Sequence, residues 1–427
     1  ATLGGSTGDA QPDNVIVNGT NAADTIAVAG GILGTLVTGL SATVNITVAE
    51  PAADRLTINA LGGADNVSAT GLGSGVIGLT LSGGTGNDVL TGSGGADVLM
   101  GDDDNDTMVG GAGDDTLFMG TGNDRSIWNP GDGTDIVEGD VGIDTVEVNG
   151  GDGAEDFTVT ANGTRVRFDR INPSPFSLDI NACENLVLNA NGGNDTLACT
   201  GNLTALIQIT ADGGPGNDTL LGSNGVDLLL GGDDQDFIDG NQANDVLFGG
   251  AGDDTVQWDP GDGSDTVEGQ AGHDILVFNG SNASEIFDFS ANGFRLRFTR
   301  NVGNVVMDVD DVEQFDLRAL GSADTITLNS LSGTDVAQVN IDLAGTLGGA
   351  SGDAQADALT INGTELPDTI HVASTGGGVE VSGLAALVRI LRSEAASDRL
   401  TVNGLGGADT LTSDPGVAAL IMLVLNP

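Results

Sequence analysis

The sequence predicts an all-β fold, a right-handed parallel β-solenoid in which short strands stack as successive coils. Three observations lead to this fold class. Glycine-rich turns recur every nine residues, an apolar residue follows each turn at a constant distance, and no segment has the apolar pattern of a long helix. With 70 Gly among 427 residues and 3% aromatic residues, the chain also lacks the large side chains of a thick core.

The repeating unit is Gly-Gly-x-Gly-x-Asp-x-apolar-x, as in Gly83-Gly84-Thr85-Gly86-Asn87-Asp88 followed by Leu90. Glycine allows positive φ and close backbone approach, so this run predicts a tight turn with inward-pointing carbonyls. The x-apolar-x triplet suits a short strand with one side chain facing a core. Two such units would close one flattened coil, and each turn is expected to line up with the turn nine residues further on.

Aspartates close these turns in two matching ladders, with a step of nine residues except for one step of eleven at the same place in each. A hard cation takes 6–8 oxygen ligands, which the carboxylates and the turn carbonyls can supply. Oxygen ligands in flexible turns favour Ca²⁺ over Mg²⁺, zinc or copper. We therefore predict several bound Ca²⁺ ions with these metal ligands: Asp88, Asp97, Asp106, Asp115, Asp124, Asp135, Asp144, Asp218, Asp227, Asp236, Asp245, Asp254, Asp265 and Asp274.

The unit resembles the RTX (hemolysin-type) calcium-binding nonapeptide of bacterial secreted proteins, a β-helix repeat. The resemblance implies calcium β-rolls, export by type I secretion, and an extracellular or cell-surface location. A solvated Gly/Asp-rich linker is the alternative, but a linker would keep neither the register nor the apolar position. Some turns depart from the unit and are expected to hold calcium less well or not at all: Asp104 and Asp234 replace glycine, Ser126 replaces an apolar residue, and Ala243 and Asn244 lie in a glycine-poor turn.

A different segment follows each run of repeats, and the two segments are related by an offset of 130 residues, as Trp128 and Trp258 show. Each contains two short strands around an Asn-Gly pair, at Asn162 or Asn292, and this pair is a strong hairpin signal. We expect broader coils with projecting hairpins. Diverged copies near both chain ends bring the number of such segments to four, beginning near Asp13, Asp144, Asp274 and Asp357.

The two terminal stretches of the chain match consecutive stretches of its interior. Residues 418–425 align with residues 338–343, and residues 3–11 match residues 347–355. The glycine-rich remnant at 348–353 is part of this match. The predicted segments are 1–82 (solenoid with divergent coils), 83–147 (first calcium β-roll), 148–212 (hairpin-bearing segment), 213–277 (second calcium β-roll), 278–345 (hairpin-bearing segment) and 346–427 (terminal solenoid resembling 1–82).

The charge balance limits the possible partners. The chain has 62 acidic and 12 basic residues and a formal net charge of −50, so a compact state repels itself and nucleic acid is an unexpected partner. Divalent cations are the natural counter-charge, and folding is expected to depend on them. No stretch of about 20 apolar residues is present, so no transmembrane helix is expected.

Two further sets of residues have alternative interpretations. Trp128 and Trp258 could stack a sugar ring, but packing inside an enlarged coil is the favoured interpretation. Arginines alternate with apolar residues at Arg165 and Arg167, and again at Arg295 and Arg297. They could pair with acidic turns of a neighbouring subunit, or with acidic groups of the same chain.

We expect a secreted structural protein without enzymatic activity, because no His-Glu-x-x-His is present and the single Gly-x-Ser-x-Gly match, Gly4 to Gly8, lies in a glycine-rich turn. An uncapped apolar end strand invites pairing with another copy, and head-to-tail contacts that do not close give filaments. The prediction is therefore a subunit that stacks end to end into an extracellular filament or surface layer. The alternatives are a segment of a large monomeric adhesin that binds surface or carbohydrate ligands, and the non-catalytic tail of an exoenzyme.

Overall fold

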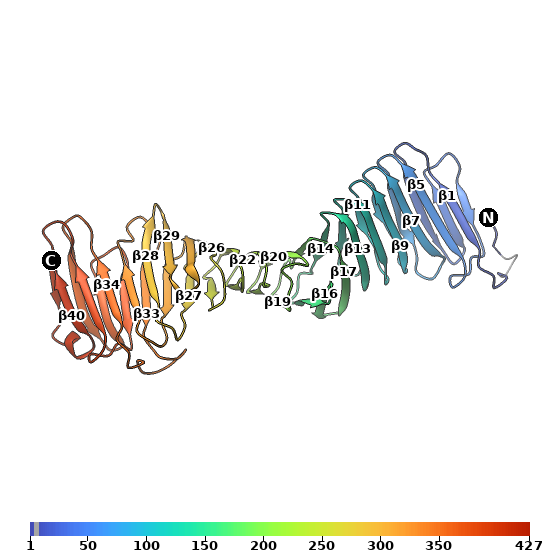
Figure 1. Cartoon of the computed structure of the whole chain (residues 1–427). Coiled ribbons are helices and arrows are strands. Elements are labelled where there is room, and N and C mark those ends of the chain that lie inside the picture. Colours follow the sequence, from blue (N-terminus) through green and yellow to red (C-terminus); the bar gives the residue numbers. More distant parts are fainter. Residues whose placement is uncertain (4–7) are drawn as a thin grey trace. The chain divides into compact units, whose positions relative to one another are not determined.

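The computed structural model describes residues 1–3 and 8–427, and the chain divides into two compact units, Ala1–Asp212 and Gly213–Pro427. Each unit is a stack of parallel strands, which confirms the predicted parallel β-solenoid (Figure 1). Within the described residues the helical elements are two single 3₁₀ turns, η1 (Val302–Asn304) and η2 (Val417–Ala419). The residues Gly4 to Thr7 of the Gly-x-Ser-x-Gly match lie outside the described part.

The strands of unit 1 alternate between two sheets along the chain. In spatial order the first sheet contains β1 (Asn14–Asn18), β5 (Arg55–Gly62), β7 (Gly78–Thr85), β9 (Asp97–Asp103), β11 (Thr116–Gly122), β13 (Asp135–Gly142), β17 (Phe176–Asn181), β16 (Arg165–Asn172), β15 (Asp156–Asn162) and β19 (Thr196–Thr200). The second contains β4 (Val44–Ile46), β3 (Gly34–Thr38), β2 (Thr25–Gly31), β6 (Asn66–Leu72), β8 (Val89–Thr91), β10 (Thr107–Val109), β12 (Arg125–Trp128), β14 (Thr145–Asn149), β18 (Asn185–Asn189) and the start of β20 (Gln208–Pro215).

Unit 2 repeats this plan. Its first sheet contains β21 (Thr219–Leu221), β23 (Phe237–Asp239), β25 (Thr255–Trp258), β27 (Ile275–Asn279), β31 (Gln314–Arg318), β33 (Gln338–Asp342), β37 (Leu387–Leu391), β36 (Gly378–Ser382), β35 (Thr369–Thr375) and β39 (Thr410–Ser413). The second contains β22 (Leu228–Asp233), β24 (Val246–Ala251), β26 (Thr266–Ala271), β30 (Val305–Asp310), β29 (Arg295–Arg300), β28 (Ile286–Asn292), β32 (Thr325–Leu328), β34 (Ala358–Asn362), β38 (Arg399–Asn403) and β40 (Met422–Asn426).

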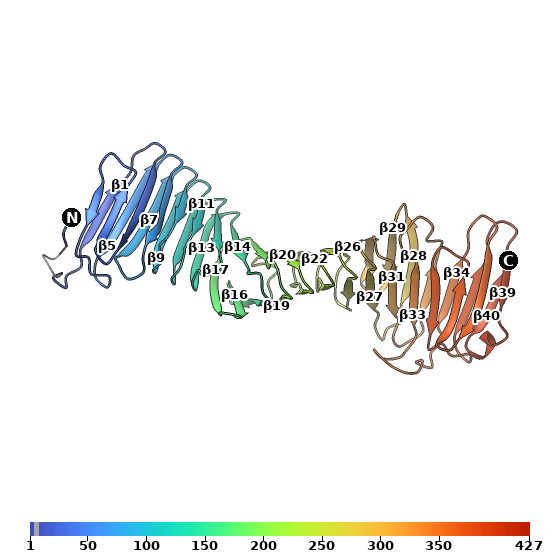
Figure 2. The same ribbon diagram turned by 180° about the vertical axis from the view of Figure 1, so that it is seen from behind.

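The coil repeats every eighteen residues, which confirms that two nonapeptides close one coil. Val89 pairs with Thr107, and Thr107 pairs with Arg125, so strands eighteen residues apart are neighbours in one sheet. Units nine residues apart, such as β8 and β9, lie in opposite sheets; Figure 2, which turns the view of Figure 1, shows β5, β7 and β9 as one continuous sheet. The expectation that turns nine residues apart share an edge was therefore wrong, because each flattened coil needs two nonapeptides to return to the same side.

The apolar position of each repeat faces the interior between the two sheets. Leu90, Leu99, Met108 and Leu229 are 0% exposed and Leu117 is 2% exposed. Ser126, the polar residue at this position, is also buried. Because the strands of the repeats are short and bury only one or two side chains each, the core between the two sheets is thin. Such a thin core makes the turns at the two edges important for stability.

Four three-stranded antiparallel inserts interrupt the regular coils, at β2–β4, β15–β17, β28–β30 and β35–β37. The Asn-Gly turns are confirmed, since Gly163 (φ 70°) joins β15 to β16 and Gly293 (φ 75°) joins β28 to β29. The hairpins do not project, however. All three strands lie within a sheet, and the third strand is the one beside the preceding coil, as in the parallel pair β13 and β17. Backbone groups of the hairpin thereby gain partners that a projecting hairpin would lack.

The inserts also bury the aromatic residues. Trp128 is 3% exposed and Trp258 is 1% exposed, and their ring N–H groups donate to the carbonyls of Gly133 and Gly263 at 2.9 Å. The packing interpretation is thus confirmed and the sugar-stacking interpretation is wrong. The arginine stripe pairs within the chain: Arg165 binds Glu138 and Asp179, and Arg295 binds Glu268, Asp308 and Asp310.

Candidate metal centre

The predicted Asp ligands all lie at the turns on the edges of the solenoid, and none is more than 6% exposed. Within a column, one carboxylate oxygen accepts the backbone N–H of the Asp one coil earlier. Asp88 N–H donates to Asp106 Oδ1 at 2.7 Å, and Asp106 N–H donates to Asp124 Oδ1 at 2.7 Å. The sequence spacing therefore produces continuous hydrogen-bonded columns of buried carboxylates, each joining consecutive coils.

The second carboxylate oxygen divides the Asp residues of the columns into two classes, and one column can contain both, as Asp97 and Asp115 show. In the open class, Oδ2 is buried and has no hydrogen-bond partner among the described residues; the ladder residues of this class are Asp88, Asp106, Asp115, Asp124, Asp144, Asp236, Asp245, Asp254 and Asp274. In the closed class, Oδ2 accepts the N–H of the residue four positions earlier, as Asp97 does from Ser93 and Asp227 from Ser223. Because a buried charged oxygen without a partner is strongly unfavourable, the open class needs a cation or a proton.

The backbone of the turn explains the two classes. In the open turns the residues four and two positions before Asp have positive φ, for example Gly84 (102°) and Gly86 (112°) before Asp88. In the closed turns the corresponding residues, such as Ser93 and Gly95 before Asp97, are not among the positive-φ residues. The positive φ rotates the N–H of the residue four positions before Asp away from the carboxylate. The Ser93 and Ser223 hydroxyls also donate to Asp97 and Asp227 Oδ1, at 3.1 and 3.0 Å.

At several open turns, the carboxylate Oδ2 and a carbonyl oxygen of the next turn converge on the glycine five positions before Asp. A Cβ on Gly83 would lie less than 3.0 Å from both Asp88 Oδ2 and the carbonyl oxygen of Gly101 in the next turn. Gly231 and Gly249 have the same surroundings, at Asp236 and Asp254. Since φ at these three glycines is not positive, they are needed for room rather than for conformation. Carboxylate and carbonyl oxygens converge here from two consecutive turns, which is the donor set of a calcium site.

The electrostatics of the open turns favour a bound cation. Burial, together with the neighbouring carboxylates, raises the pKa of Asp106 and of Asp115 to about 8. The pKa of Asp245 in unit 2 is raised to about 8 for the same reason, and that of Asp236 to about 7. Like charges spaced along a column resist ionisation together. A divalent cation between two turns would remove this repulsion and lower these pKa values.

Comparison with known families agrees with this geometry. The family model of the RTX calcium-binding nonapeptide repeat (4 copies) matches residues 80–108, 91–125, 212–245, 221–256 and 261–282. The chain carries RTX calcium-binding repeats. None of the curated proteins compared with the chain matches it. The matched stretches contain twelve of the fourteen predicted ligands and exclude Asp135 and Asp144, which follow the step of eleven residues. Across residues 1–3 and 8–427, no helix is long and apolar enough to cross a membrane.

The RTX turns fit calcium on their own oxygen atoms. Carboxylate Oδ2 atoms and turn carbonyls of the open class would hold the ions, and a bound ion supplies positive charge that joins one coil to the next. The RTX turns that depart from the repeat keep this geometry, since Asp104 and Asp234 both have φ 77° and Ala243 has φ 95°. Their carboxylates Asp106, Asp236 and Asp245 belong to the open class.

The carboxylate columns extend beyond the RTX repeats, which the sequence interpretation missed. Backbone N–H groups of Asp144 and Asp274 donate to the carboxylates of Glu184 and Glu313 at 2.8 Å. The same bond from a backbone N–H to a carboxylate adds further members, or rungs, to the columns: Asp65, Asp195, Asp324, Asp357 and Asp398. A signal was available in the sequence. Each of these acidic residues stands two positions before a buried apolar residue that is the second residue of a strand, as Glu184 does before Leu186.

Two further acidic residues of the columns, Glu155 and Glu285, donate their N–H groups to Asp195 and Asp324 and are each paired with an arginine. Glu155 is paired with Arg170 (Nη1 to Oε1, 2.6 Å), and Glu285 is paired with Arg300; these side chains are at most 8% exposed. Arg170 also donates from Nε and Nη2 to the carbonyl oxygen of Ser174, at 3.2 and 3.0 Å. The guanidinium stacks over the ring of Trp128 at 5.2 Å. The Arg170 guanidinium thus binds a carboxylate of the column and a turn carbonyl, the same ligand types that an ion would take in the RTX turns.

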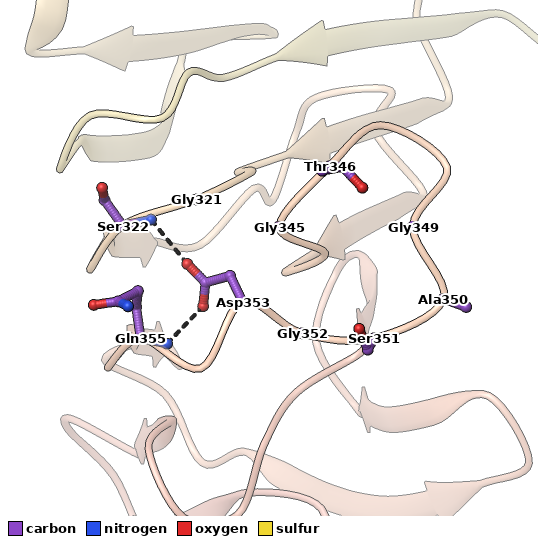
Figure 3. A pocket seen from close by; sticks show the side chains of 10 residues that line it. All are labelled: Gly321, Ser322, Gly345, Thr346, Gly349, Ala350, Ser351, Gly352, Asp353 and Gln355. Carbon is purple, nitrogen blue, oxygen red and sulfur yellow. Dashed lines mark hydrogen bonds between the residues drawn. The ribbon is translucent and has the colours of Figure 1, made fainter.

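The glycine-rich remnant at 348–353 does not form an open turn. Asp353 Oδ2 accepts the N–H of Ser322 and Oδ1 accepts the N–H of Gln355, both at 2.8 Å (Figure 3). The loop borders a cavity of about 540 Å³ lined by Gly321, Ser322, Gly345, Thr346, residues 349–353 and Gln355. Because both oxygens of Asp353 already have donors, this turn differs from the open RTX turns despite its similar sequence.

Proposed function

We propose that the protein is a non-enzymatic structural protein of the bacterial cell exterior, in which calcium stabilises the solenoid and copies associate end to end. RTX repeats are typical of bacterial secreted proteins, and calcium is abundant outside cells. Extracellular calcium modules have dissociation constants on the order of 10⁻⁴–10⁻³ M, so the open turns would fill after export. The buried positions of the tryptophans favour a structural role over sugar binding.

The observation that carries end-to-end association is the match between the end strands and an interior junction of unit 2. Strands β1, β2 and β3 have the same lengths and spacing as β34, β35 and β36, with an offset of 344 residues. The contacts match too: Ala10 N–H donates to Glu50 Oε2 at 2.8 Å, as Ala354 N–H does to Glu394 Oε2 at 2.6 Å. The start of unit 1 therefore repeats the backbone that follows β33 in unit 2.

The last strands of unit 2 complete this match. Strand β40 lies on β38 as β33 lies on β31, with Arg399 opposite Met422 and Gln314 opposite Gln338. In the interior, β33 continues to β37 on its other side, whereas β40 has no further strand neighbour within residues 213–427. The counterpart of β37 in unit 1 is β4. We therefore infer that β40 of one copy pairs in parallel with residues 43–47 of the next, with Leu425 opposite Ile46.

The side chains at these edges are suited to the contact. Leu423 and Leu425 of β40 are half-buried, whereas Val339 and Ile341 at the same positions of β33 are 0% and 1% exposed. Pairing would remove this apolar surface from water and supply partners to the edge backbone. Residues 1–3 occupy this edge of β4 and must be displaced first. Leu3 N–H donates to Thr47 O at 3.0 Å, Thr47 N–H donates to Ala1 O at 2.9 Å, and the Ala1 ammonium group donates to Asn45 O.

The test is electron microscopy and light scattering of the chain with calcium and with chelator. Calcium-dependent filaments are expected, and Leu425→Arg should abolish them because it places a charge in the contact. Val306→Arg, an exposed position on β30, is the matched control and should leave them intact. A monodisperse chain in calcium would reject association and favour the alternative, in which the same register joins modules within a longer adhesin.

A further inference from the structure

Asp65 lies in a turn outside the RTX repeats that has the complete geometry of the open class, as does Asp324 in unit 2. Asp65 is 2% exposed, and its Oδ2 is buried without a hydrogen-bond partner among the described residues. The sequence of its turn, Ala60-Leu61-Gly62-Gly63-Ala64-Asp65, lacks the repeat unit, and the family match begins only at residue 80. The unpaired buried oxygen nevertheless poses the same electrostatic problem as those of Asp88 and Asp106.

The backbone of this turn has the same pattern of positive φ as the RTX turn that follows it. Leu61 (φ 82°) and Gly63 (φ 112°) take the left-handed conformation of Gly84 (102°) and Gly86 (112°). Leu61 is a bulky residue that rarely adopts this conformation, so the surrounding structure must impose it. The positive φ at Leu61 also keeps its N–H away from Asp65, in contrast to the closed turn of Asp24, where Thr20 N–H donates to Oδ2 at 2.6 Å.

The stacking of the two turns is also that of consecutive RTX turns. Leu61 pairs with Gly84 just as Gly84 pairs with Asp102. Gly63 N–H donates to Thr85 O at 2.8 Å, and the same bond joins Gly252 to Ala271 at 2.8 Å in unit 2. Asp65 N–H donates to Asp88 Oδ1 at 2.7 Å, which places Asp65 in the column of Asp88 and Asp106.

One difference from the repeat is Ala60, which stands where Gly83 and Gly101 stand in the next two turns. A side chain at this position is accommodated within the RTX repeats themselves. Met119 occupies it in the turn of Asp124, where Oδ2 is likewise buried and unpaired. The methyl group of Ala60 is therefore compatible with an open turn.

We propose that a Ca²⁺ ion binds between the turns at residues 61–65 and 84–88, with Asp65 Oδ2 as a ligand together with turn carbonyls. The calcium column of unit 1 thereby begins one coil before the repeats that the sequence reveals. The inference rests on calcium binding by the RTX turns and does not depend on association between copies.

Native mass spectrometry with Ca²⁺ alone tests the proposal by counting ions on each chain. The experiment uses the full chain carrying Leu425→Arg, so that end-to-end association cannot affect the count. Asp65→Asn in this background should bind one ion fewer than the parent. The matched control is Asp24→Asn, the preceding rung of the same column, whose Oδ2 already has a donor; its count should equal that of the parent. An unchanged count for Asp65→Asn would overturn the proposal.

A second measurement covers the case in which Asp65→Asn does not fold. Crystals of the unsubstituted chain grown in calcium and soaked with Tb³⁺ should show an anomalous peak between Asp65 and Asp88, besides peaks at the Asp106 and Asp124 turns. Peaks at the latter turns alone would reject the site at Asp65 and leave calcium binding by the RTX repeats intact.

Discussion

Replacing Asp106 by asparagine should change stability in opposite directions with and without calcium. Asp106 is 2% exposed, its Oδ2 has no partner in the described structure, and burial raises its pKa to about 8. Above pH 8 without calcium, the wild-type chain must bury an unpaired charge. The amide removes that charge while its oxygen still accepts the N–H of Asp88. Stability should therefore rise by about 1–3 kcal/mol, the usual penalty of an unsatisfied buried group.

With calcium the sign reverses, because the amide nitrogen faces the ion in place of an oxygen. The loss of one site with a dissociation constant of about 10⁻⁴–10⁻³ M removes about 1.4–2.7 kcal/mol at about 10 mM Ca²⁺. The matched control is Asp97→Asn. Both oxygens of Asp97 accept hydrogen bonds from Ser93, so this substitution should destabilise the chain equally in both conditions.

The assay is thermal unfolding followed by circular dichroism at pH 8.5, in chelator and in calcium. Each variant is compared with the wild-type chain in the same buffer. The reasoning would be refuted if Asp106→Asn and Asp97→Asn showed the same dependence on calcium. It would also be refuted if Asp106→Asn destabilised the calcium-free chain, since the unpaired oxygen would then not destabilise the wild-type chain.

Three further outcomes are expected. Burial raises the pKa of Asp115 and Asp245 to about 8, above the value in the unfolded chain. Their contribution to the stability of the calcium-free fold is therefore complete below about pH 4 and is lost as the pH rises through 8. Calcium binds the charged form of these carboxylates, so binding should release protons and should be weaker at pH 6. Calorimetry in buffers of different ionisation enthalpy measures the proton release, and binding heats that do not depend on the buffer would contradict the expectation. Arg170→Met leaves the carboxylate of Glu155 buried without its cation and should cost about 3–5 kcal/mol in urea unfolding, most of it recovered by adding Glu155→Gln; equal losses in the single and double variants would show that the pair is unimportant. Gly122→Ala should lose about 1–3 kcal/mol more than Gly163→Ala in the same urea assay. Both glycines have positive φ, but a Cβ on Gly122 would collide with the carbonyl of Asp104, whereas Gly163 faces open space; equal losses would mean that only conformation matters.

The repeats themselves made much of the fold predictable. A nine-residue period with one apolar position admits only short strands with one buried face, and the Asn-Gly pairs at Asn162 and Asn292 mark their hairpins directly. The positions of the ladder aspartates at the edges follow from the same period. These features depend on local conformation, which neighbouring residues in the chain decide.

The path through the inserts could not be predicted in the same way. Whether β15 or β17 lies beside β13 depends on which edge backbone groups find partners, and this choice involves residues about forty positions apart. For the same reason the Arg170 and Glu155 pair was not expected, because the hairpin must form before the guanidinium reaches the carboxylate column.

The sequence by itself therefore determined a calcium-binding solenoid with acidic columns along its edges, because period and residue type are properties of the chain. Only the tertiary structure decided which carboxylates remain without a hydrogen-bond donor. Asp97 stands in the repeat register and yet has a donor, whereas Asp65 stands outside it and has none for Oδ2. The physical reason is the orientation of a peptide group four residues before each Asp, which the stacking of one coil on the next imposes.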